Sequence, residues 1–149
     1  MYLGGAISAG WDLRSVEVMR RIQRAWACVG RYKMEIYDCP SVRLRLKMRM
    51  LKAEVMEAVI YGCVTWSPSK AVYERLRKVH HQMLLGCLRW RKRKREDHVL
   101  SYAKALLRTD SESVETTVRR RSILFAGFVA RMGERAPAEK GDVWGDARR

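Results

Sequence analysis

The sequence lacks the features that define several large functional classes. No apolar run approaches the roughly 20 residues that a bilayer-spanning helix requires, so we expect no membrane partner of that kind. The start, MYLGGAISAG, has neither the charged nor the apolar region of a signal peptide, and we expect a soluble protein that is nuclear or cytoplasmic. The nucleophile elbow G-x-S-x-G and a glycine-rich phosphate loop ending in Lys-Ser or Lys-Thr are both absent. The sequence therefore predicts no enzyme of these kinds.

Cysteine is scarce, and its spacing is wrong for a zinc site. No two cysteines have the two-to-four-residue separation of a zinc knuckle. The four are Cys28, Cys39, Cys63 and Cys87. All but Cys39 lie in helical apolar patterns, where a free thiol behaves as a small hydrophobic group. We expect reduced, mostly buried thiols, and we predict no metal and no other cofactor.

Acidic residues are also few, and this imbalance is the strongest compositional signal. The 149 residues include 31 Lys and Arg but only 16 Asp and Glu, which gives a formal net charge of +15. A field of that sign attracts an extended polyanion, either nucleic acid or an anionic membrane surface. Basic amphipathic helices do bind such membranes, but the basic faces here are broad and polar. We therefore favour nucleic acid and expect no membrane partner.

One long stretch, residues 41–66, organises the rest of the chain. Its sequence, SVRLRLKMRMLKAEVMEAVIYGCVTW, places apolar residues four and three apart, which on an α-helix aligns them in one stripe. The stripe consists of Leu44, Met48, Leu51, Val55, Val59, Gly62 and Trp66. Basic residues flank its first half, whereas the only charges from residue 53 to residue 66 are Glu54 and Glu57. We predict one continuous helix with a basic surface half and a buried apolar half.

Two further helices are predicted on either side of this stretch. Asp12 or Ser15 caps a helix that runs to about Tyr32. Its predicted stripe is Val16, Met19, Ile22, Trp26 and Val29. Ser67 and Pro68 supply an N-cap and a first-turn proline for the next helix. Its predicted stripe is Val72, Leu76, Val79, Met83 and Cys87.

The chain then continues with two more amphipathic pieces. A short one spans residues 98–108, and Ser111 or Ser113 caps a longer one. The stripe of the longer helix is Val114, Val118, Phe125, Val129 and Met132.

The predicted fold class is all-α, a helical bundle of about five helices with one short N-terminal β-strand and a disordered C-terminal tail. β-Forming residues and paired glycines at residues 2–8 predict the strand and a turn. We divide the chain into a strand and turn at 1–10, a helical domain at 11–132 and a disordered tail at 133–149, which has no helical or strand period.

Nearly every predicted helix carries basic residues outside its apolar stripe. We predict that these residues contact phosphate groups, because each cation that neutralises a phosphate releases counterions. Such contacts carry little base specificity. The predicted contact residues are Arg20, Arg21, Arg24, Arg43, Arg45, Lys47, Arg49, Lys52, Arg89, Arg91, Lys92, Arg93, Lys94, Arg95, Arg119, Arg120 and Arg121.

Six of the seven residues from Arg89 to Arg95 are cationic, and this run has three interpretations. It is a solvated connection, a nuclear localisation patch or a phosphate-contacting loop. Trp90 lies inside the run and either stacks on a base or sugar or packs in the core. The adjacent His80 and His81 point about 100° apart on a helix, so we predict surface or partner contacts rather than metal ligands.

Five short strings occur in a recognisable order along residues 2–132. They are Tyr2-Leu3-Gly4-Gly5; Arg21-Ile22 with Ala25-Trp26; Val59-Ile60-Tyr61-Gly62 with Trp66; Leu88-Arg89-Trp90; and Arg121 followed by Phe125-Ala126-Gly127-Phe128-Val129-Ala130-Arg131-Met132. Together they resemble the region that follows the polymerase palm in the reverse transcriptases of LINE-type, non-LTR retrotransposons. The chain departs from that family at Phe128, where the family usually has histidine.

The resemblance implies that residues 1–10 are a remnant of the last palm strand and turn, and that the helices correspond to the thumb. The thumb holds the template–primer duplex, so the implied ligand is an RNA/DNA hybrid or duplex. Polymerase chemistry needs acidic residues that converge on two metal ions, commonly including an adjacent aspartate pair. The aspartates of this chain are isolated: Asp12, Asp38, Asp97, Asp110, Asp142 and Asp146. We therefore expect a non-catalytic fragment of an RNA-directed DNA polymerase, and no catalytic residue.

Two alternatives stand beside this interpretation. One is a retroelement relic with no selected activity, and the other is a nuclear helical protein-interaction module whose basic run is an import signal. A thumb without its palm would also expose apolar surface. We therefore expect a marginally stable fold that self-associates or pairs with a palm-containing polymerase chain.

Overall fold

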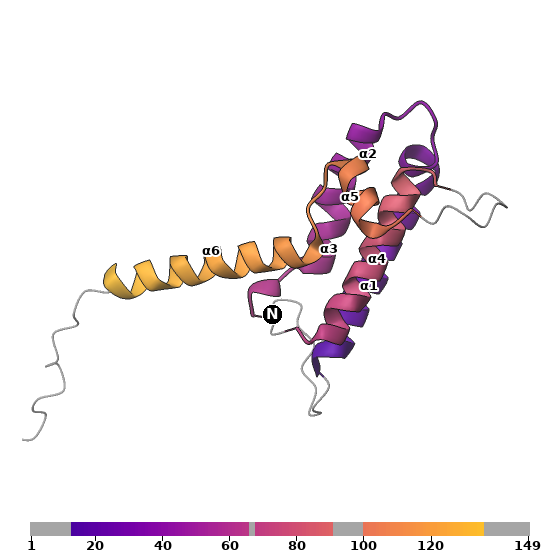
Figure 1. The fold of residues 1–149 in the computed structure, drawn as a ribbon. Helices are drawn as coiled ribbons and strands as arrows, with labels where there is room; N and C mark the ends of the chain where they lie inside the picture. Colours follow the sequence, from indigo (N-terminus) through magenta and orange to yellow (C-terminus); the bar gives the residue numbers. More distant parts are fainter. Residues whose placement is uncertain (1–12, 66–67, 91–99, 136–149) are drawn as a thin grey trace, which may run out of the picture.

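The computed structural model describes residues 13–65, 68–90 and 100–135 (Figure 1). Within these ranges every regular element is helical, which confirms the predicted all-α class. The elements are α1 (Leu13–Arg31), the π-helix η1 (Lys33–Tyr37), α2 (Leu44–Met50), the π-helix η2 (Leu51–Met56), α3 (Glu57–Ile60), the 3-10 helix η3 (Cys63–Thr65), α4 (Lys70–Cys87), α5 (Tyr102–Thr109) and α6 (Val114–Arg135).

Two predicted segments at the ends of the chain fall mostly beyond these ranges. The strand predicted at residues 2–8 lies outside the described residues, as do residues 136–149 of the predicted tail. Residues 133–135, which the prediction assigned to the tail, are instead the last residues of α6. The helix therefore continues past Gly133, where the apolar period of the sequence ends.

The central stretch is helical without a break from Leu44 to Ile60, in the order α2, η2 and α3. Its predicted stripe is buried at Met48, Leu51, Val55 and Val59. The π-helical segment was not predicted. A π-helix has a wider turn than an α-helix, and here it accompanies a broader buried face that also includes Met56 and Ile60.

The central helix ends earlier than predicted, at Ile60 rather than Trp66. Tyr61 leaves the helical conformation with ψ 129°, and Gly62 follows with φ +68°. A positive φ is the left-handed region, which glycine adopts without steric strain. Gly62 therefore ends the helix instead of continuing its apolar stripe.

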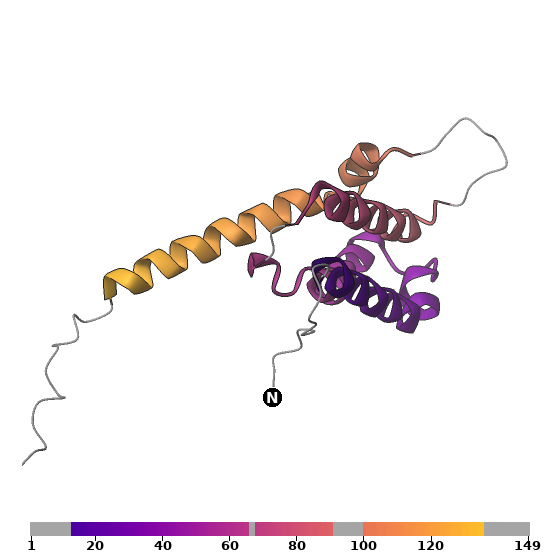
Figure 2. The ribbon, with the colours of Figure 1, turned by 90° about the horizontal axis from the view of Figure 1, so that it is seen from below.

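The central helix, α1 and α4 form the body of the molecule, and α5 covers α4 (Figures 1 and 2). The largest fully buried side chains come from the central helix, η3, α4 and α6: Leu51, Val55, Ile60, Cys63, Leu76, Leu84, Val114 and Val118. Burying one such aliphatic side chain contributes about 1.5–3 kcal/mol. One core thus joins segments from both halves of the chain.

The predicted stripe of α1 is confirmed at Ile22, which is buried, and at Val29, which packs against the core, but it is wrong at its other positions. Val18, Ile22 and Ala25 are buried, whereas Val16 and Trp26 are 45% and 38% exposed. The buried face is rotated toward Arg21, which a pattern of apolar residues treats as a surface position. Its burial is the reason for the error.

The predicted stripe of α4 is confirmed, but its first turn is not. Ser69 rather than Ser67 caps the helix, and its Oγ accepts a hydrogen bond from the Val72 N–H at 3.4 Å. At the other end, the Arg89 N–H donates to the Gly86 carbonyl and the Trp90 N–H donates to the Leu85 carbonyl, each at 2.9 Å. This Schellman pattern normally uses glycine at the left-handed position, which Arg89 occupies here with φ 51°.

The last helix, α6, is buried only at its start. Ser113 caps it as one of the two predicted candidates, with Oγ 3.1 Å from the Thr116 N–H. Val114 and Val118 are buried, but the same stripe continues through Phe125, Val129 and Met132, which are exposed. Figures 1 and 2 both show α6 extending away from the other helices. The outer half of the helix is therefore not part of the bundle, contrary to the prediction of a helical spine packed in the core.

Candidate nucleic-acid interface

Two of the predicted phosphate-contacting residues are buried, which corrects the prediction for both. Lys47 is 2% exposed, and its Nζ donates to the Tyr37 carbonyl at 2.6 Å. Arg21 is 7% exposed, pairs with Glu17 at 2.5 Å and holds its guanidinium 5.4 Å from the centre of the Tyr61 ring. Each charge has local partners inside the fold. These two cations therefore hold helices together instead of facing a ligand.

Two more predicted residues are engaged in surface ion pairs on α6. Arg120 pairs with Glu112 at 2.9 Å. Arg121 makes two hydrogen bonds to the Glu57 carboxylate, which raise the pKa of the guanidinium above its usual range. Exposed pairs of this kind contribute about 0–1 kcal/mol to the free energy of unfolding. Their main effect here is that a carboxylate partly neutralises each of these two arginines.

The remaining described candidates keep their charge at the surface. Arg20, Arg24, Arg43, Arg45, Arg49, Arg89 and Arg119 are exposed, and none of the ion pairs between described residues includes them. Lys52 is exposed as well, with its Nζ 3.4 Å from the Asp110 carbonyl. The candidates at 91–95 lie outside the described residues.

Some of these exposed cations are aligned along single helices. Arg45, Arg49 and Lys52 follow one another at steps of four and three, so they form one row beside the buried stripe of the central helix. Arg20 and Arg24 are four apart on α1 and form a second, shorter row. Arg119 belongs to α6 and is not part of either row. The predicted residues therefore occupy several surfaces, of which the central row is the most regular.

Helix α4 carries exposed cations that were not among the predicted contact residues. Arg75 and Lys78 are both exposed. Together with Arg77 they form a basic cluster within four residues, and the prediction considered only the apolar stripe and the histidines of this helix. Their positions outside the buried stripe of α4 are the signal that would have found them. They extend the exposed positive charge toward the end of α4.

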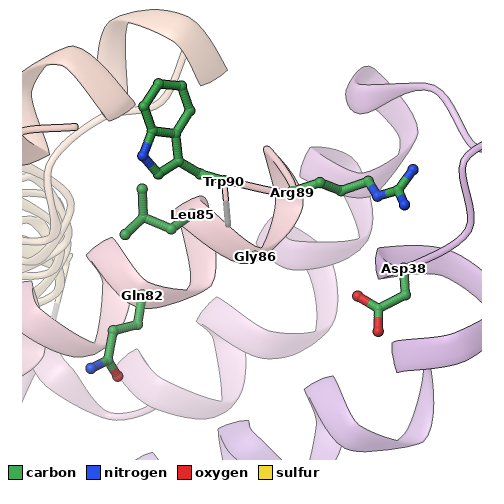
Figure 3. Close-up of a pocket in the computed structure, with 6 residues that line it drawn as sticks. All are labelled: Asp38, Gln82, Leu85, Gly86, Arg89 and Trp90. Carbon is green, nitrogen blue, oxygen red and sulfur yellow. The ribbon is translucent and has the colours of Figure 1, made fainter. Parts of the chain in front are cut away.

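A surface depression of about 250 Å³ lies at the end of α4 (Figure 3). It is lined by Gln82, Leu85, Gly86, Arg89 and Trp90 of α4 and its cap, together with Asp38, which follows η1. Figure 3 shows Arg89 and Trp90 projecting in opposite directions from the helix end. The depression thus has an apolar wall on one side and charged groups on the other.

Trp90 is half-buried and packs against the core, while the Arg108 guanidinium lies 5.0 Å from the centre of its ring. A cation over an aromatic face contributes about 0.5–1 kcal/mol at an exposed site. Of the two interpretations of this side chain, core packing is confirmed. Because Trp90 also lines the depression, part of its indole ring is accessible.

The prediction for His80 is wrong, because the side chain is buried rather than at the surface. Its Nδ1 lies 2.9 Å from the Tyr102 hydroxyl, and that oxygen also lies 3.3 Å from the Val114 N–H. Because an amide N–H can only donate, the Tyr102 oxygen accepts from Val114, and its own O–H is free to donate to Nδ1 of a neutral His80 ring. This chain of bonds ties α4, α5 and α6 together.

Burial lowers the pKa of His80 from its ordinary value of 6.5 to about 4, despite the nearby Glu115 carboxylate. His81 is only half-buried, and its Nε2 donates to the Leu100 carbonyl at 2.9 Å. Among the described residues, no group of three His, Cys, Asp or Glu side chains is arranged to hold a metal ion. Both histidines serve the packing of α4 against its neighbours.

Comparisons with known proteins add no family to this description. Neither the protein-family models, nor the curated proteins, nor the solved structures include a significant match to the chain.

In the part of the chain that the structure describes, no helix is long and apolar enough to cross a membrane. The four cysteines are free thiols, and burial raises the pKa of Cys87 to about 12.

The buried imidazole predicts a pH-dependent loss of stability. An unfolded chain binds a proton at His80 near pH 6.5, whereas the folded chain resists protonation down to about pH 4. This contribution is complete above the unfolded pKa and is lost as the pH falls toward the folded pKa, by roughly 2–3 kcal/mol at about pH 4.5. We expect His80→Gln, which does not titrate, to lose less stability than the wild-type chain between about pH 7.5 and 4.5 in urea unfolding.

His81→Gln is the matched control, because that ring is half-buried on the same helix. It should keep the wild-type pH dependence. Identical pH dependence of the wild-type chain and His80→Gln would contradict the assignment of the buried neutral imidazole.

Proposed function

We propose that this chain is a non-catalytic, thumb-like nucleic-acid-binding protein, related in origin to the polymerases of LINE-type retrotransposons. Its ligand would be a template–primer duplex, with an RNA/DNA hybrid as the form that the resemblance implies. The proposal is supported by the net charge of +15, the all-α fold and the five family-like strings within residues 2–132. Binding would proceed through phosphates and without sequence specificity.

The observation that carries the proposal is the row Arg45, Arg49 and Lys52 on the outer side of the central helix. These side chains are exposed, while Met48, Leu51, Val55 and Val59 in the neighbouring stripe of the same helix are buried. The buried face holds the row in a fixed orientation. Cations in such an arrangement attract a phosphate backbone with little loss of conformational freedom in the protein backbone.

The row belongs to a larger set of exposed cations rather than standing alone. Arg20 and Arg24 on α1, Arg75 and Lys78 on α4, and Arg89 after α4 are all exposed. The five cations at 91–95 follow directly along the chain. A ligand with regularly repeated negative charge would contact the cations that share a surface with the central row.

Removing the row should weaken the salt dependence of binding. For the full chain and a short RNA/DNA hybrid, we expect the logarithm of the binding constant to fall linearly with the logarithm of salt concentration. The triple variant Arg45→Ala, Arg49→Ala and Lys52→Ala should make that slope shallower by about 0.9 for each phosphate that it no longer neutralises, up to about 2.7. Fluorescence anisotropy at several salt concentrations measures both slopes.

Arg77→Ala is the matched control for this experiment. Arg77 is exposed on α4, but its guanidinium is already engaged by the Glu115 carboxylate, with Nε 2.7 Å from Oε1. Its removal should leave the slope close to that of the wild-type chain. A triple variant with an unchanged slope would contradict the proposed contact row.

Substitution of the run 91–95 tests whether these residues contact phosphate or act as an import signal. Altered localisation with unchanged hybrid affinity would assign that run to nuclear import.

The outer half of α6 favours a second candidate function, protein–protein interaction. Ile123 and Leu124 are 71% and 65% exposed, and Phe125, Phe128, Val129 and Met132 are exposed as well. Phe125, Val129 and Met132 continue the stripe that is buried at Val114 and Val118. Phe125, Phe128 and Met132 repeat at steps of three and four, the spacing of a coiled-coil seam. A palm-containing polymerase chain or a second copy of this chain would cover such a face.

For the isolated chain, we expect concentration-dependent self-association through this face. The double variant Phe125→Ser and Phe128→Ser should shift the chain toward monomer, because it removes two large apolar side chains from the seam. Sedimentation velocity over a range of concentrations gives the oligomeric state. Leu107→Ser is the control, since Leu107 is 83% exposed and lies on α5, away from this stripe. A wild-type chain that stays monomeric at high concentration would rule out self-association through α6.

A further inference from the structure

The depression at the end of α4 has a floor without a side chain. Gly86 is exposed in the last turn of α4, and a Cβ atom placed there would meet no atom within 4 Å. Its backbone conformation is ordinary helix, so no turn or close packing requires glycine at this position. Glycine within a helix costs about 1 kcal/mol relative to alanine. A side chain at position 86 would therefore project into the depression.

The walls of the depression differ in chemistry on its two sides. Leu85 and Trp90 offer apolar surface, and part of the indole is accessible. On the other side, the Asp38 carboxylate and the Arg89 guanidinium come from two different elements (Figure 3). Asp38 is exposed, and none of the ion pairs between described residues includes it. An available carboxylate in a basic surface can accept hydrogen bonds from a ligand.

The backbone holds these groups in place. The Asp38 N–H donates to the Lys33 carbonyl at 2.7 Å, which closes η1. The Schellman pattern places Arg89 in its left-handed conformation and separates its side chain from that of Trp90. The negative end of the α4 dipole also lies here, which favours hydrogen-bond donors over anions at the floor.

We propose that this depression holds one unpaired guanine base of a bound nucleic acid, an inference that rests on the proposed function. The volume of about 250 Å³ is below the range of about 300–1,000 Å³ of pockets for drug-sized ligands, which limits the ligand to a small ring system. The apolar side covers a flat ring, and Arg89 neutralises the attached phosphate. Among the bases, guanine alone presents two adjacent N–H donors on its pairing edge, which match the two oxygens of the Asp38 carboxylate.

The test compares an RNA/DNA hybrid that carries one unpaired 3′ guanosine with the same hybrid ending in unpaired uridine and with the blunt hybrid. The full chain should bind the guanosine form at least about fivefold more tightly, the low end for bidentate recognition of a base. Gly86→Leu adds a side chain to the floor, where a Cβ atom meets no atom within 4 Å, and should abolish this preference. Asp38→Asn, which replaces one acceptor oxygen by a donor, should abolish it too, while both variants bind the blunt hybrid like the wild-type chain.

Gly30→Leu is the matched control, because Gly30 is also exposed in a helix, and a Cβ atom added there would likewise meet no atom within 4 Å. It should keep the guanosine preference. Binding of the blunt hybrid with no difference between the guanosine and uridine forms would overturn the guanine site and leave the proposed function standing. A preference that survives Gly86→Leu would overturn the site as well.

Free guanosine and uridine monophosphates separate the two proposals when the hybrid does not bind. A wild-type chain that ignores the blunt hybrid in dilute buffer but prefers the guanosine monophosphate, with the preference lost in Gly86→Leu, would support the site and contradict the duplex-binding function. No binding of either probe would overturn both.

Discussion

Burial of the apolar face of residues 44–60 decides which cations of this protein can reach a ligand. The helix must hide Met48, Leu51, Val55 and Val59 against its neighbours, because exposing them would forfeit most of the free energy that holds the fold together. Once that face is buried, Arg45, Arg49 and Lys52 have only the outer side available. The same constraint brings Lys47 inside, where the Tyr37 carbonyl accepts its hydrogen bond. Hydrophobic burial thus arranges the electrostatics of the surface.

Polar groups inside the molecule connect helices that apolar contacts alone would orient less specifically. Tyr102 bonds both His80 of α4 and the first residue of α6, Val114, so one hydroxyl joins three helices. Arg21 joins α1 to the turn after α3 through the Tyr61 ring. Such groups are costly to bury unless they have polar or charged partners, which these three side chains have. They fix the surroundings of α4, on whose outer end the candidate base site lies.

The fold class, the buried stripes of the central helix and α4, and the cap at Ser113 followed from the sequence, since each rests on local spacing or capping chemistry. Two features did not follow. The phase of α1 depends on the burial of Arg21, an ion-paired residue that spacing rules place at the surface. The exposure of Phe125 and Met132 depends on which elements pack against α6, and periodicity cannot distinguish a core stripe from an uncovered one.

The candidate site also has one part that was predictable from the sequence and one part that was not. Exposure of the row on the central helix was predictable from its position beside the apolar stripe, whereas the same reasoning wrongly placed Lys47 and Arg21 at the surface. The depression at Gly86 was not, because Asp38 is distant in sequence and reaches the end of α4 only through the packing of α1 and η1. A glycine in the last turn of a helix is a weak signal until a carboxylate from another element is found beside it.

The reactivity of individual lysines toward an acylating reagent, with and without a saturating RNA/DNA hybrid, tests the central claim most directly. Lys47, which is 2% exposed, should remain unmodified in both states, while the exposed Lys52 should react in the free chain and become protected by the hybrid. Mass spectrometry of the digested chain reports each site separately. Equal reactivity of the two lysines, or a Lys52 that the hybrid leaves unprotected, would contradict the account.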